Sequence, residues 1–369
     1  GKGPILQTAG WEEMVKRQQI EGKMAAEKKS AYARAGVDID AANQTKGAIK
    51  ELVRSTFNEG VLGDMGGFGG LFIPPWRECE EPVLVSSVDG VGTKLKLAFM
   101  SGIHGSVGMD IVNHCANDIL VQGARPLFFM DYLALGSHEP AVVEAIVRGL
   151  AQACRDIGCV LIGGETAEMA GFYQAGEYDL AGSIVGIVDR QRIIDGRTIE
   201  AGDVVIGLAS DGLHTNGYTL ARKVIIEQGG LGLDEPLGET GRTVAEEMLR
   251  PHRAYVKPIL GLMEEIDVRG LVHITGGGFW DNVPRPLPQG LGVVIRKGEW
   301  EIPPVFSFLA RVGPIDEREM FHVFNMGIGM MAFMRREEGE KGVTILRDLG
   351  EDARIIGEVV EGEQAVKLV

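Results

Sequence analysis

Two carboxylates, an amide and an imidazole recur at helical spacing in the segment VGMDIVNHCANDILVQGARP. Apolar side chains at three- and four-residue intervals predict a helix over residues 107–122, with one face turned toward a core. The other sides carry Asp110, His114, Asn117 and Asp118. Carboxylate and amide oxygens suit Mg²⁺, which also accepts phosphate oxygens and water. The helix is therefore a candidate metal site, and the alternative interpretation is a polar face turned toward solvent.

A second candidate is the hexapeptide DGVGTK, residues 89–94, which closes an apolar strand. Its backbone N–H groups and the ammonium group of Lys94 suit a phosphate, while the carboxylate of Asp89 suits a metal ion. The hexapeptide is not the P-loop pattern, and a tight glycine turn with one surface lysine would look similar. The chain has 53 glycines, and the cluster at residues 63–70 indicates a loop where backbone approaches a ligand.

Two polar motifs follow apolar segments further along the chain. GGETAEM places Glu165 and Glu168 after the segment CVLI, where a carboxylate can serve an active site or cap a helix. The motif SDGLHTNGY carries Ser210, His214, Thr215 and Asn216. This set could hold a sugar, an amide or a phosphate, although Thr215 and Asn216 also fit as caps of a following helix.

A last polar motif, HITGGGF, sets His273 shortly before the glycines Gly276, Gly277 and Gly278. Consecutive glycines can turn their N–H groups toward an anion, and a histidine beside them can carry a proton. The motif therefore predicts an anion-binding loop with an adjacent proton carrier. The alternative is a structural histidine, which is the commoner role for a single one.

The elements that must position these groups alternate between strands and helices. Strands are predicted over 81–89, 126–135, 159–164, 178–189, 203–210, 291–296 and 327–334, and further helices over 43–57, 140–157, 216–228 and 243–266. A polar, turn-like stretch at 193–202 separates two such sets. We predict an α/β protein with an N-terminal extension (1–31) and two domains (32–190 and 191–369), each a mixed sheet covered by helices.

Composition narrows the function classes. Asp and Glu number 52 against 37 Lys and Arg, and this formal charge of -15 disfavours binding to nucleic acid or to an anionic membrane. The four cysteines, Cys79, Cys115, Cys154 and Cys159, form no CxxC pair and read as reduced. Neither a long apolar run nor a signal-peptide centre occurs, so we expect a cytoplasmic protein.

Together these segments resemble the phosphoribosylformylglycinamidine cyclo-ligase family, also called aminoimidazole ribonucleotide synthetases. The motifs YARAGVDIDAAN, GGFGG, DGVGTKLKLA, LIGGETAEM, GLHTNGY, HITGGGFWDNVPR and FNMGIGM occur in the family's order. The superfamily signature Dx4GAxP is met by Asp118, Gly123, Ala124 and Pro126. The resemblance runs from Tyr32 to near the C-terminus, and the family offers no role for the extension before it.

The resemblance implies a reaction and an assembly. ATP and formylglycinamidine ribonucleotide would give aminoimidazole ribonucleotide, ADP and phosphate, through an iminophosphate that the substrate's own amine attacks. The protein would mainly position two anionic ligands and neutralise their charge. The family also implies a homodimer in which the N-terminal domains join their sheets into a β-barrel.

Resemblance and residue chemistry together assign the expected roles. Asp89, Asp118 and Glu165 are the expected Mg²⁺ ligands. The expected ATP contacts are Lys50, Gly66, Gly67, Gly69, Gly70, Asp89, Gly90, Gly92, Thr93 and Lys94. The expected substrate contacts are Glu165, His214, Thr215, Asn216, His273, Gly276, Gly277 and Gly278. Lys94, Asp118, His214 and His273 are the expected catalytic residues, and which histidine is an acid or a base stays open.

Other members of the same superfamily fit less well. A selenophosphate synthetase would carry a reactive cysteine or selenocysteine near the glycine loop, whereas Cys79 lies in a different context, RECEEP. A hydrogenase-maturation relative would end in a functional cysteine, but this chain ends VKLV. A thiamine-monophosphate kinase fits by fold but not with GGGFWDN. The remaining alternative is a non-catalytic nucleotide-binding subunit of an amidotransferase assembly.

Overall fold

The computed structural model describes residues 47, 49–64 and 66–369. The predicted extension at residues 1–31, the motif YARAGVDIDAAN and the start of the helix predicted over 43–57 lie outside the described residues. Residues 49–54 are helical, in agreement with the remainder of that prediction. A two-stranded hairpin of β1 (Val61–Leu62) and β2 (Leu71–Phe72) then brackets the glycine cluster.

The N-terminal part is built on a four-stranded sheet. Its order is β3 (Pro82–Gly90), β6 (Tyr178–Asp189), β4 (Arg125–Leu135) and β5 (Val160–Glu168). Only β4 and β5 run parallel, and the connection between them is a helix, as a parallel crossover requires. The predicted mixed sheet is confirmed. The motif GGETAE does not follow strand β5 as predicted but forms its second half, paired with β4.

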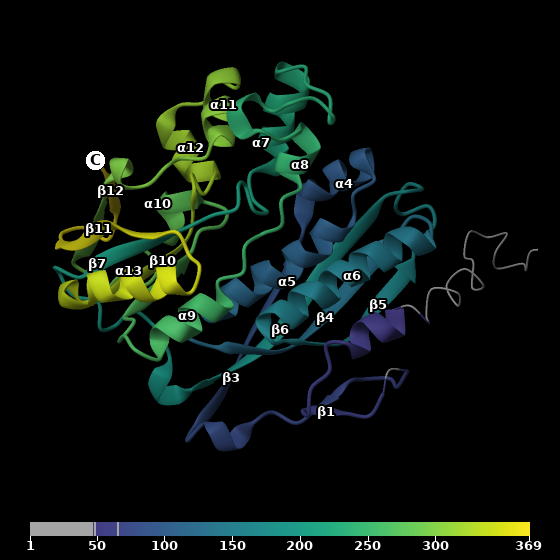
Figure 1. Ribbon diagram of the computed structural model, residues 1–369, viewed down its shortest axis with the longest axis horizontal. Coiled ribbons are helices and arrows are strands. Elements are labelled where there is room, and N and C mark those ends of the chain that lie inside the picture. Colours follow the sequence, from purple (N-terminus) through teal and green to yellow (C-terminus); the bar gives the residue numbers. More distant parts are fainter. Residues whose placement is uncertain (1–46, 48, 65) are drawn as a thin grey trace, which may run out of the picture.

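Helices cover one face of this sheet (Figure 1). They are α4 (Leu95–Ser101), α5 (Gly105–Leu120) and α6 (Pro140–Ile157). Helices α5 and α6 cross closely at Gly108 and Gly149, where an added Cβ on either residue would collide with backbone of the other helix. The close crossing lets both helices lie flat on the sheet. Their bounds agree closely with the predicted helices at 107–122 and 140–157.

The opposite face of the four-stranded sheet is left largely uncovered and is apolar. Leu84, Val88, Met130 and Tyr132 are exposed on strands β3 and β4, and Val88 keeps 73% of its surface accessible. Alternation along β3 explains the pattern, because successive side chains point to opposite faces and Val85 is buried beneath the helices. An exposed apolar sheet face of this kind is a candidate interaction surface.

The C-terminal part holds a six-stranded sheet. Its order is β12 (Val366–Leu368), β9 (Leu291–Ile295), β11 (Ala353–Glu361), β7 (Val204–Ala209), β10 (Ile328–Met334) and β8 (Gly270–His273). Along β10, Met330 and Met334 pack in one core cluster while Met331 and Phe333 pack in the other. Strand β10 is therefore buried on both faces, which accounts for its almost continuous apolar sequence.

Helices cover both faces of this second sheet. On one side lie α9 (Val256–Met263) and α13 (Gly339–Asp348), and on the other α7 (Tyr218–Arg222), α10 (Gly278–Asn282), α11 (Pro304–Val312) and α12 (Glu317–Val323). A π-helical stretch, Lys223–Gln228, continues α7 to the predicted end at residue 228. Short 3-10 turns occur at Trp76–Glu78, Gly92–Lys94, Arg190–Arg192, Gly238–Thr240, Lys297–Glu299 and Arg336–Glu338.

The single helix predicted over 243–266 is wrong. The chain forms α8 (Val244–Met248), then an irregular segment at residues 249–255, and then α9. Pro251 explains the break, because proline has no N–H to donate and disfavours helical geometry in the residue before it. The irregular segment therefore carries backbone groups that need partners from elsewhere in the molecule.

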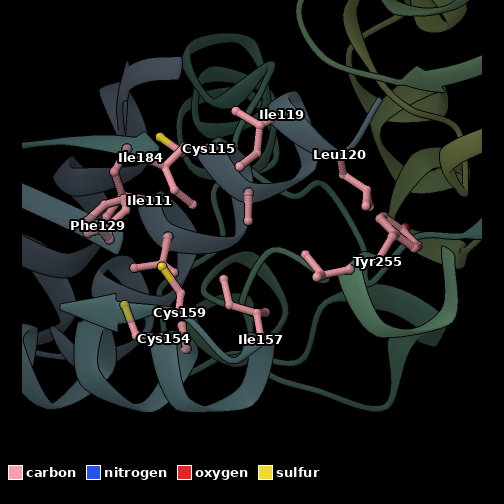
Figure 2. Packing of buried hydrophobic residues seen from close by; sticks show 14 of the residues in the cluster. Ile111, Cys115, Ile119, Leu120, Phe129, Cys154, Ile157, Cys159, Ile184 and Tyr255 are labelled. Atoms are coloured by element: carbon pink, nitrogen blue, oxygen red, sulfur yellow. The ribbon is translucent and has the colours of Figure 1, made fainter. Parts of the chain in front are cut away.

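One hydrophobic cluster joins the two parts of the molecule. Figure 2 shows Ile111, Ile119 and Leu120 of helix α5 in the same cluster as Tyr255, which begins the second part's α9 region. Cys115, Cys154 and Cys159 are buried and unpaired, as predicted, while Cys79 is half-buried. Helix α5 is thus covered by the sheet on one side and by the C-terminal part on the other, so its polar residues face protein as well.

Candidate active site

Polar side chains of α5 form hydrogen bonds with backbone groups of the irregular segment at residues 249–255. The carboxylate of Asp110 accepts a hydrogen bond from the backbone N–H of His252 at 2.7 Å, and Asn113 donates to the carbonyl oxygen of His252 at 2.7 Å. One turn further, the amide oxygen of Asn117 accepts from the backbone N–H of Tyr255 at 3.0 Å. Asp110 and Asn117 are fully buried. The interpretation of this stripe as a solvent-facing surface is therefore wrong.

Lys94 lies inside this contact rather than at a phosphate site. Its side chain is fully buried, with Nζ 2.9 Å from Oδ1 and 2.8 Å from Oδ2 of Asp110. The same ammonium group donates to the backbone carbonyl oxygens of His214 at 3.0 Å and Arg250 at 2.7 Å. Burial lowers the pKa of Lys94 and raises that of Asp110, while their mutual attraction opposes both shifts. The expected contact between Lys94 and ATP phosphate is not compatible with this placement.

Asp118 and Asp89 each receive a hydrogen bond from a histidine. Oδ1 of Asp118 lies 2.9 Å from Nδ1 of His273, and its Oδ2 accepts from the hydroxyl group of Ser87 at 3.1 Å. Oδ2 of Asp89 lies 2.8 Å from Nε2 of His114. The side chains of Asp89 and Asp118 remain 43% and 29% exposed. Both carboxylates are thus fixed in direction and still reachable from solvent.

These two carboxylates suit a hard metal ion. The hydrogen bond from His114 lowers the pKa of Asp89. Burial raises the pKa of Asp118, but the hydrogen bond and charge of His273 outweigh burial, so this pKa is also lowered. Ligand atoms of Asp89, Asp118 and His114 lie within 4.8 Å of one another. Two ionised carboxylates at this separation can share one Mg²⁺ and leave its other positions to phosphate oxygens and water.

Glu165 does not join this pair. In the sheet register Asp89 lies opposite Gly182, Gly182 opposite Asp131, and Asp131 opposite Gly164. Three strand spacings of about 4.8 Å each put roughly 14 Å between strand β3 and strand β5, where Glu165 follows Gly164. The expected set of three metal ligands is therefore not brought together within one chain, because strands β6 and β4 separate its members.

The glycine loop and Glu165 instead line a cavity of about 630 Å³. Gly66, Gly67, Gly69, Gly70, Met130 and Asp131 also line it. Burial raises the pKa of Asp131 to about 7, and the nearby charge of Glu165 adds to the shift. The sequence analysis missed Asp131 because it lies inside the apolar run PLFFMDYLAL. Lys50 lies near this cavity and pairs with Asp64 at 2.8 Å.

A second cavity, of about 280 Å³, opens beside His273. Its polar lining includes Asp118, Gln122, His273, Thr275, Asn282 and Arg285. Arg285, in the quoted motif HITGGGFWDNVPR, was not among the predicted site residues, and its guanidinium group suits an anion. The cavity thus combines a carboxylate, an imidazole and a guanidinium group drawn from both parts of the molecule.

Four histidines pack together behind these carboxylates. His214 and His252 stack with ring centroids 4.1 Å apart, and His114 and His273 each lie within 5.2 Å of His252, centroid to centroid. Thr215 contacts Nδ1 of His114 at 2.8 Å and Nδ1 of His252 at 3.2 Å. His252 was missed by the sequence analysis, because it stands alone inside the segment predicted to be helical.

The remaining predicted residues occupy turns around this cluster. Thr93 hydrogen-bonds with Thr219 at 2.9 Å, next to the positive-φ glycine Gly92. Gly90 ends strand β3, and its N–H donates to Asp89 at 2.6 Å. Among the last three predicted glycines, Gly277 and Gly278 have positive φ and Gly276 lies beside Asn216. His214 is almost fully buried, with Nε2 accepting from the N–H of Asp211 at 3.0 Å.

Two family models match consecutive parts of the chain. AIR synthase related protein, N-terminal domain, matches residues 77–188, and AIR synthase related protein, C-terminal domain, matches residues 200–368. Phosphoribosylformylglycinamidine cyclo-ligases of a Bacillus cereus strain and of Bacillus thuringiensis strain Al Hakam are 54% and 53% identical over 333 residues, spanning 90% of this chain and 96% of each relative.

Solved structures share the fold at much lower identity. Thiamine-monophosphate kinase from Stenotrophomonas maltophilia has a TM-score of 0.63 at 18% identity, covering 87% of this chain and 95% of its own. E. coli HypE, a hydrogenase maturation protein, has a TM-score of 0.62 at 19% identity, covering 89% and 93%. These likenesses show the fold alone. With both family models matched and more than half of the 333 aligned residues identical to those of the Bacillus enzymes, the chain belongs to the phosphoribosylformylglycinamidine cyclo-ligase family.

Proposed function

We propose that this chain closes the imidazole ring of formylglycinamidine ribonucleotide, using ATP and releasing ADP and phosphate. Its 54% identity to a phosphoribosylformylglycinamidine cyclo-ligase over 90% of the chain supports the reaction. The main structural support for the proposed site is the hydrogen bond between Asp118 and His273. It links helix α5 to the end of strand β8, and both residues line the cavity there. An amide oxygen is a poor leaving group, so the reaction requires its phosphorylation before the amine attacks.

The proposed metal ion is Mg²⁺, held by Asp89 and Asp118. The fit rests on their lowered pKa values and on oxygen atoms close enough to share one ion. When bound, Mg²⁺ would neutralise phosphate charge as it is transferred. Glu165 is not included, since strands β6 and β4 lie between it and Asp89.

We assign the cavity beside His273 to the substrate and the glycine-loop cavity to the nucleotide. Arg285 is the cation that lines the first cavity, and we propose that it binds the phosphate group of the ribonucleotide. His273 directs Nδ1 toward Asp118, so the carboxylate would fix the orientation of the imidazole ring against the substrate. Glycine N–H groups in the second cavity would contact ATP phosphates.

Lys94 would act through position rather than by touching ATP. Its ammonium group ties Asp110 of helix α5 to the backbone of His214 and Arg250. These contacts fix the loop that carries His214 and Thr215 against the helix that carries Asp118. The proposed role of Lys94 is therefore to keep the two halves of the site in register.

The proposed assembly is a homodimer formed through the open face of the N-terminal sheet. Leu84, Val88, Met130 and Tyr132 make this face apolar, and pairing it with a second copy would remove it from water. A cytoplasmic location stays a prediction from the sequence. Within residues 47, 49–64 and 66–369, no helix has the length and apolarity needed to span a bilayer.

A reconstitution assay tests the reaction directly. Purified protein is incubated with formylglycinamidine ribonucleotide, ATP and Mg²⁺, and both ADP and the aminoimidazole product are quantified. Product should require all three components together. ADP released equally fast with thiamine monophosphate in place of the ribonucleotide, without imidazole formation, would show that the proposed function is wrong.

A further inference from the structure

We propose that the carboxyl group of Asp131 binds the amino edge of the adenine ring of ATP and so selects the base in the glycine-loop cavity. This role rests on the proposed function, which assigns that cavity to the nucleotide and its glycines to the phosphates, and it adds the group that recognises the base. Asp131 lines the cavity, and the sheet places it on strand β4 opposite Gly182 of β6 and Gly164 of β5.

The sequence around Asp131 is otherwise that of a buried strand. Phe129 and Leu133 lie on the same side of β4, because side chains two residues apart share a face, and both are fully buried. Asp131 has glycine opposite it on both adjacent strands, and an added Cβ on Gly164 would collide with Oδ1 of Asp131. Glycine at position 164 therefore leaves room for a carboxyl group where an apolar side chain would ordinarily pack.

The carboxyl group of Asp131 has no cationic partner in the described part of the chain. The charge that acts on it is that of Glu165, which has the same sign. Lys50 and Arg54, from the helix that precedes the glycine loop, both pair with Asp64 instead. A carboxyl group removed from water without a partner costs free energy, and a ligand that supplies the missing hydrogen bonds offsets this cost. The cavity therefore calls for a ligand that carries a hydrogen-bond donor.

The lining of the cavity suits a purine base. Its volume of about 630 Å³ lies within the range of small-molecule sites, roughly 300–1,000 Å³. Apolar side chains form much of its wall, namely Phe57, Val61, Leu62, Leu71, Met130 and Ile162. A purine has two apolar faces that can pack against such a wall, and a polar edge that needs hydrogen-bond partners. The carboxyl group of Asp131 is a partner for that edge.

Adenine and a carboxyl group match in two hydrogen bonds. Burial raises the pKa of Asp131 to about 7, so the neutral form is readily available near neutral pH. The neutral carboxyl group has one O–H donor and one carbonyl acceptor. Its carbonyl oxygen can accept from the exocyclic amino group of adenine while its O–H donates to the ring nitrogen N1. An asparagine amide also offers one acceptor and one donor, and would form the same pair of bonds.

The test compares the binding of three competitors at saturating Mg²⁺, without turnover. ATP, purine riboside triphosphate, which lacks the amino group, and tripolyphosphate each displace a fluorescent ATP analogue labelled on the ribose. Wild-type protein should bind ATP about 10-fold more tightly than purine riboside triphosphate, because one hydrogen bond is lost. Equal affinity for these two would overturn base recognition by Asp131 while leaving the nucleotide cavity in place. Wild-type protein from which ATP displaces nothing would contradict the proposed function as well.

Two variants separate hydrogen bonding from charge. Asp131→Asn keeps a donor and an acceptor and should retain the preference for ATP. Asp131→Leu removes both, so it should bind ATP about 10-fold more weakly and the two triphosphates equally. The matched control is Asp156→Leu, at an exposed carboxylate of α6 that accepts from Gln152 at 2.8 Å, and it should bind like wild type. Equal losses of ATP affinity in Asp131→Asn and Asp131→Leu would show that Asp131 acts as a charge, as a cation ligand would, and would overturn the assignment.

The pH dependence gives an answer even if Asp131→Leu fails to fold. Because the neutral carboxyl group donates to N1, the ATP affinity of wild type should fall on the order of 10-fold from about pH 6.5 to about pH 8.5. The other ionisable groups that interact with Asp131 are Glu165 of β5 and Cys154 of α6, and both remain in Asp131→Asn, as do the phosphates of ATP. The affinity of Asp131→Asn should therefore change much less. The same change in both proteins would overturn the proposal.

Discussion

Nδ1 of His273 lies 2.9 Å from Oδ1 of Asp118, although 155 positions separate the two residues in the chain. Helix α5 brings the carboxylate and the end of strand β8 brings the imidazole. Neither residue depends on the other for its secondary structure, so the contact reports how the two parts of the molecule are docked. A substitution at this site can therefore affect the reaction itself or the packing between the two parts of the molecule, and different variants are needed to test each effect.

Asp118→Asn tests the chemistry. Asparagine keeps an acceptor oxygen for His273 but removes the negative charge that a metal ion needs, so folding should be spared. We expect turnover at saturating substrates to fall by about 10²- to 10³-fold, as when one stabilising group is removed from a transition state. Turnover is measured across a Mg²⁺ series, with thermal unfolding as the control. Wild-type turnover at every Mg²⁺ concentration would refute the metal role.

Lys94→Met tests the docking. Methionine fills similar space but leaves the buried carboxylate of Asp110 without its cation, which should cost about 3–5 kcal/mol of stability. The control is Lys96→Met, two residues along, where a partly exposed lysine pairs with Glu177 and the loss should be below about 1 kcal/mol. Denaturant unfolding measures both. Equal stabilities for the two variants would show that the buried pair does not hold the domains together.

Acidification should destabilise the metal-free protein. Burial holds the pKa values of His214 and His252 well below the ordinary 6.5, so below that pH the unfolded chain binds more protons than the folded one. Each such histidine lowers the free energy of unfolding by about 1.4 kcal/mol per pH unit. Burial also acts on His114, but Asp89 and Asp118 outweigh it and raise its pKa, so the stabilisation that His114 contributes is complete below about pH 6.5 and is lost only at higher pH.

Because the pKa values of His273 and His104 are also lowered, four histidines favour the unfolded chain as the pH falls below 6.5, and we expect a net loss of stability between about pH 6.5 and 5. Denaturant unfolding at about pH 7.5 and about pH 5.5 measures this loss. In His252→Gln, the free energy of unfolding should change less with pH, by the contribution of one histidine. Stability that is constant or increases toward the acid end of this range would contradict the inferred protonation states.

Val88→Lys tests the dimer. The valine is exposed on the open sheet face, on edge strand β3, and a charge there should be costly only if a second copy covers it. Light scattering should give a dimer mass for wild type and a mass near one subunit for the variant. Leu349→Lys, at an exposed leucine of the C-terminal part, is the control and should stay dimeric. Removing residues 1–30 should also leave the dimer, and a wild-type monomer would contradict the assembly.

The sequence by itself determined the local elements and the family. Strand alternation and helical spacing predicted the four strands of the first sheet, strands β7, β9 and β10 of the second, and the helices near 107–122 and 140–157, because those patterns depend on neighbours along the chain. Strands β8, β11 and β12 were not predicted. The motifs also predicted Asp89, Asp118 and His273 as site residues, and the structure places their side chains around His114 and close to one another.

Tertiary structure decided which polar residues meet. Periodicity separates apolar from polar faces, but it cannot tell whether a polar face meets water or the backbone of a distant segment, and so Asp110 and Lys94 were misplaced. Strand order likewise has no local signal, and it set Glu165 apart from Asp89. His252 entered the site because Pro251 interrupts a helix and the freed backbone groups pair with α5. Such contacts depend on docking between parts of the chain about 140 residues apart, which only the folded molecule specifies.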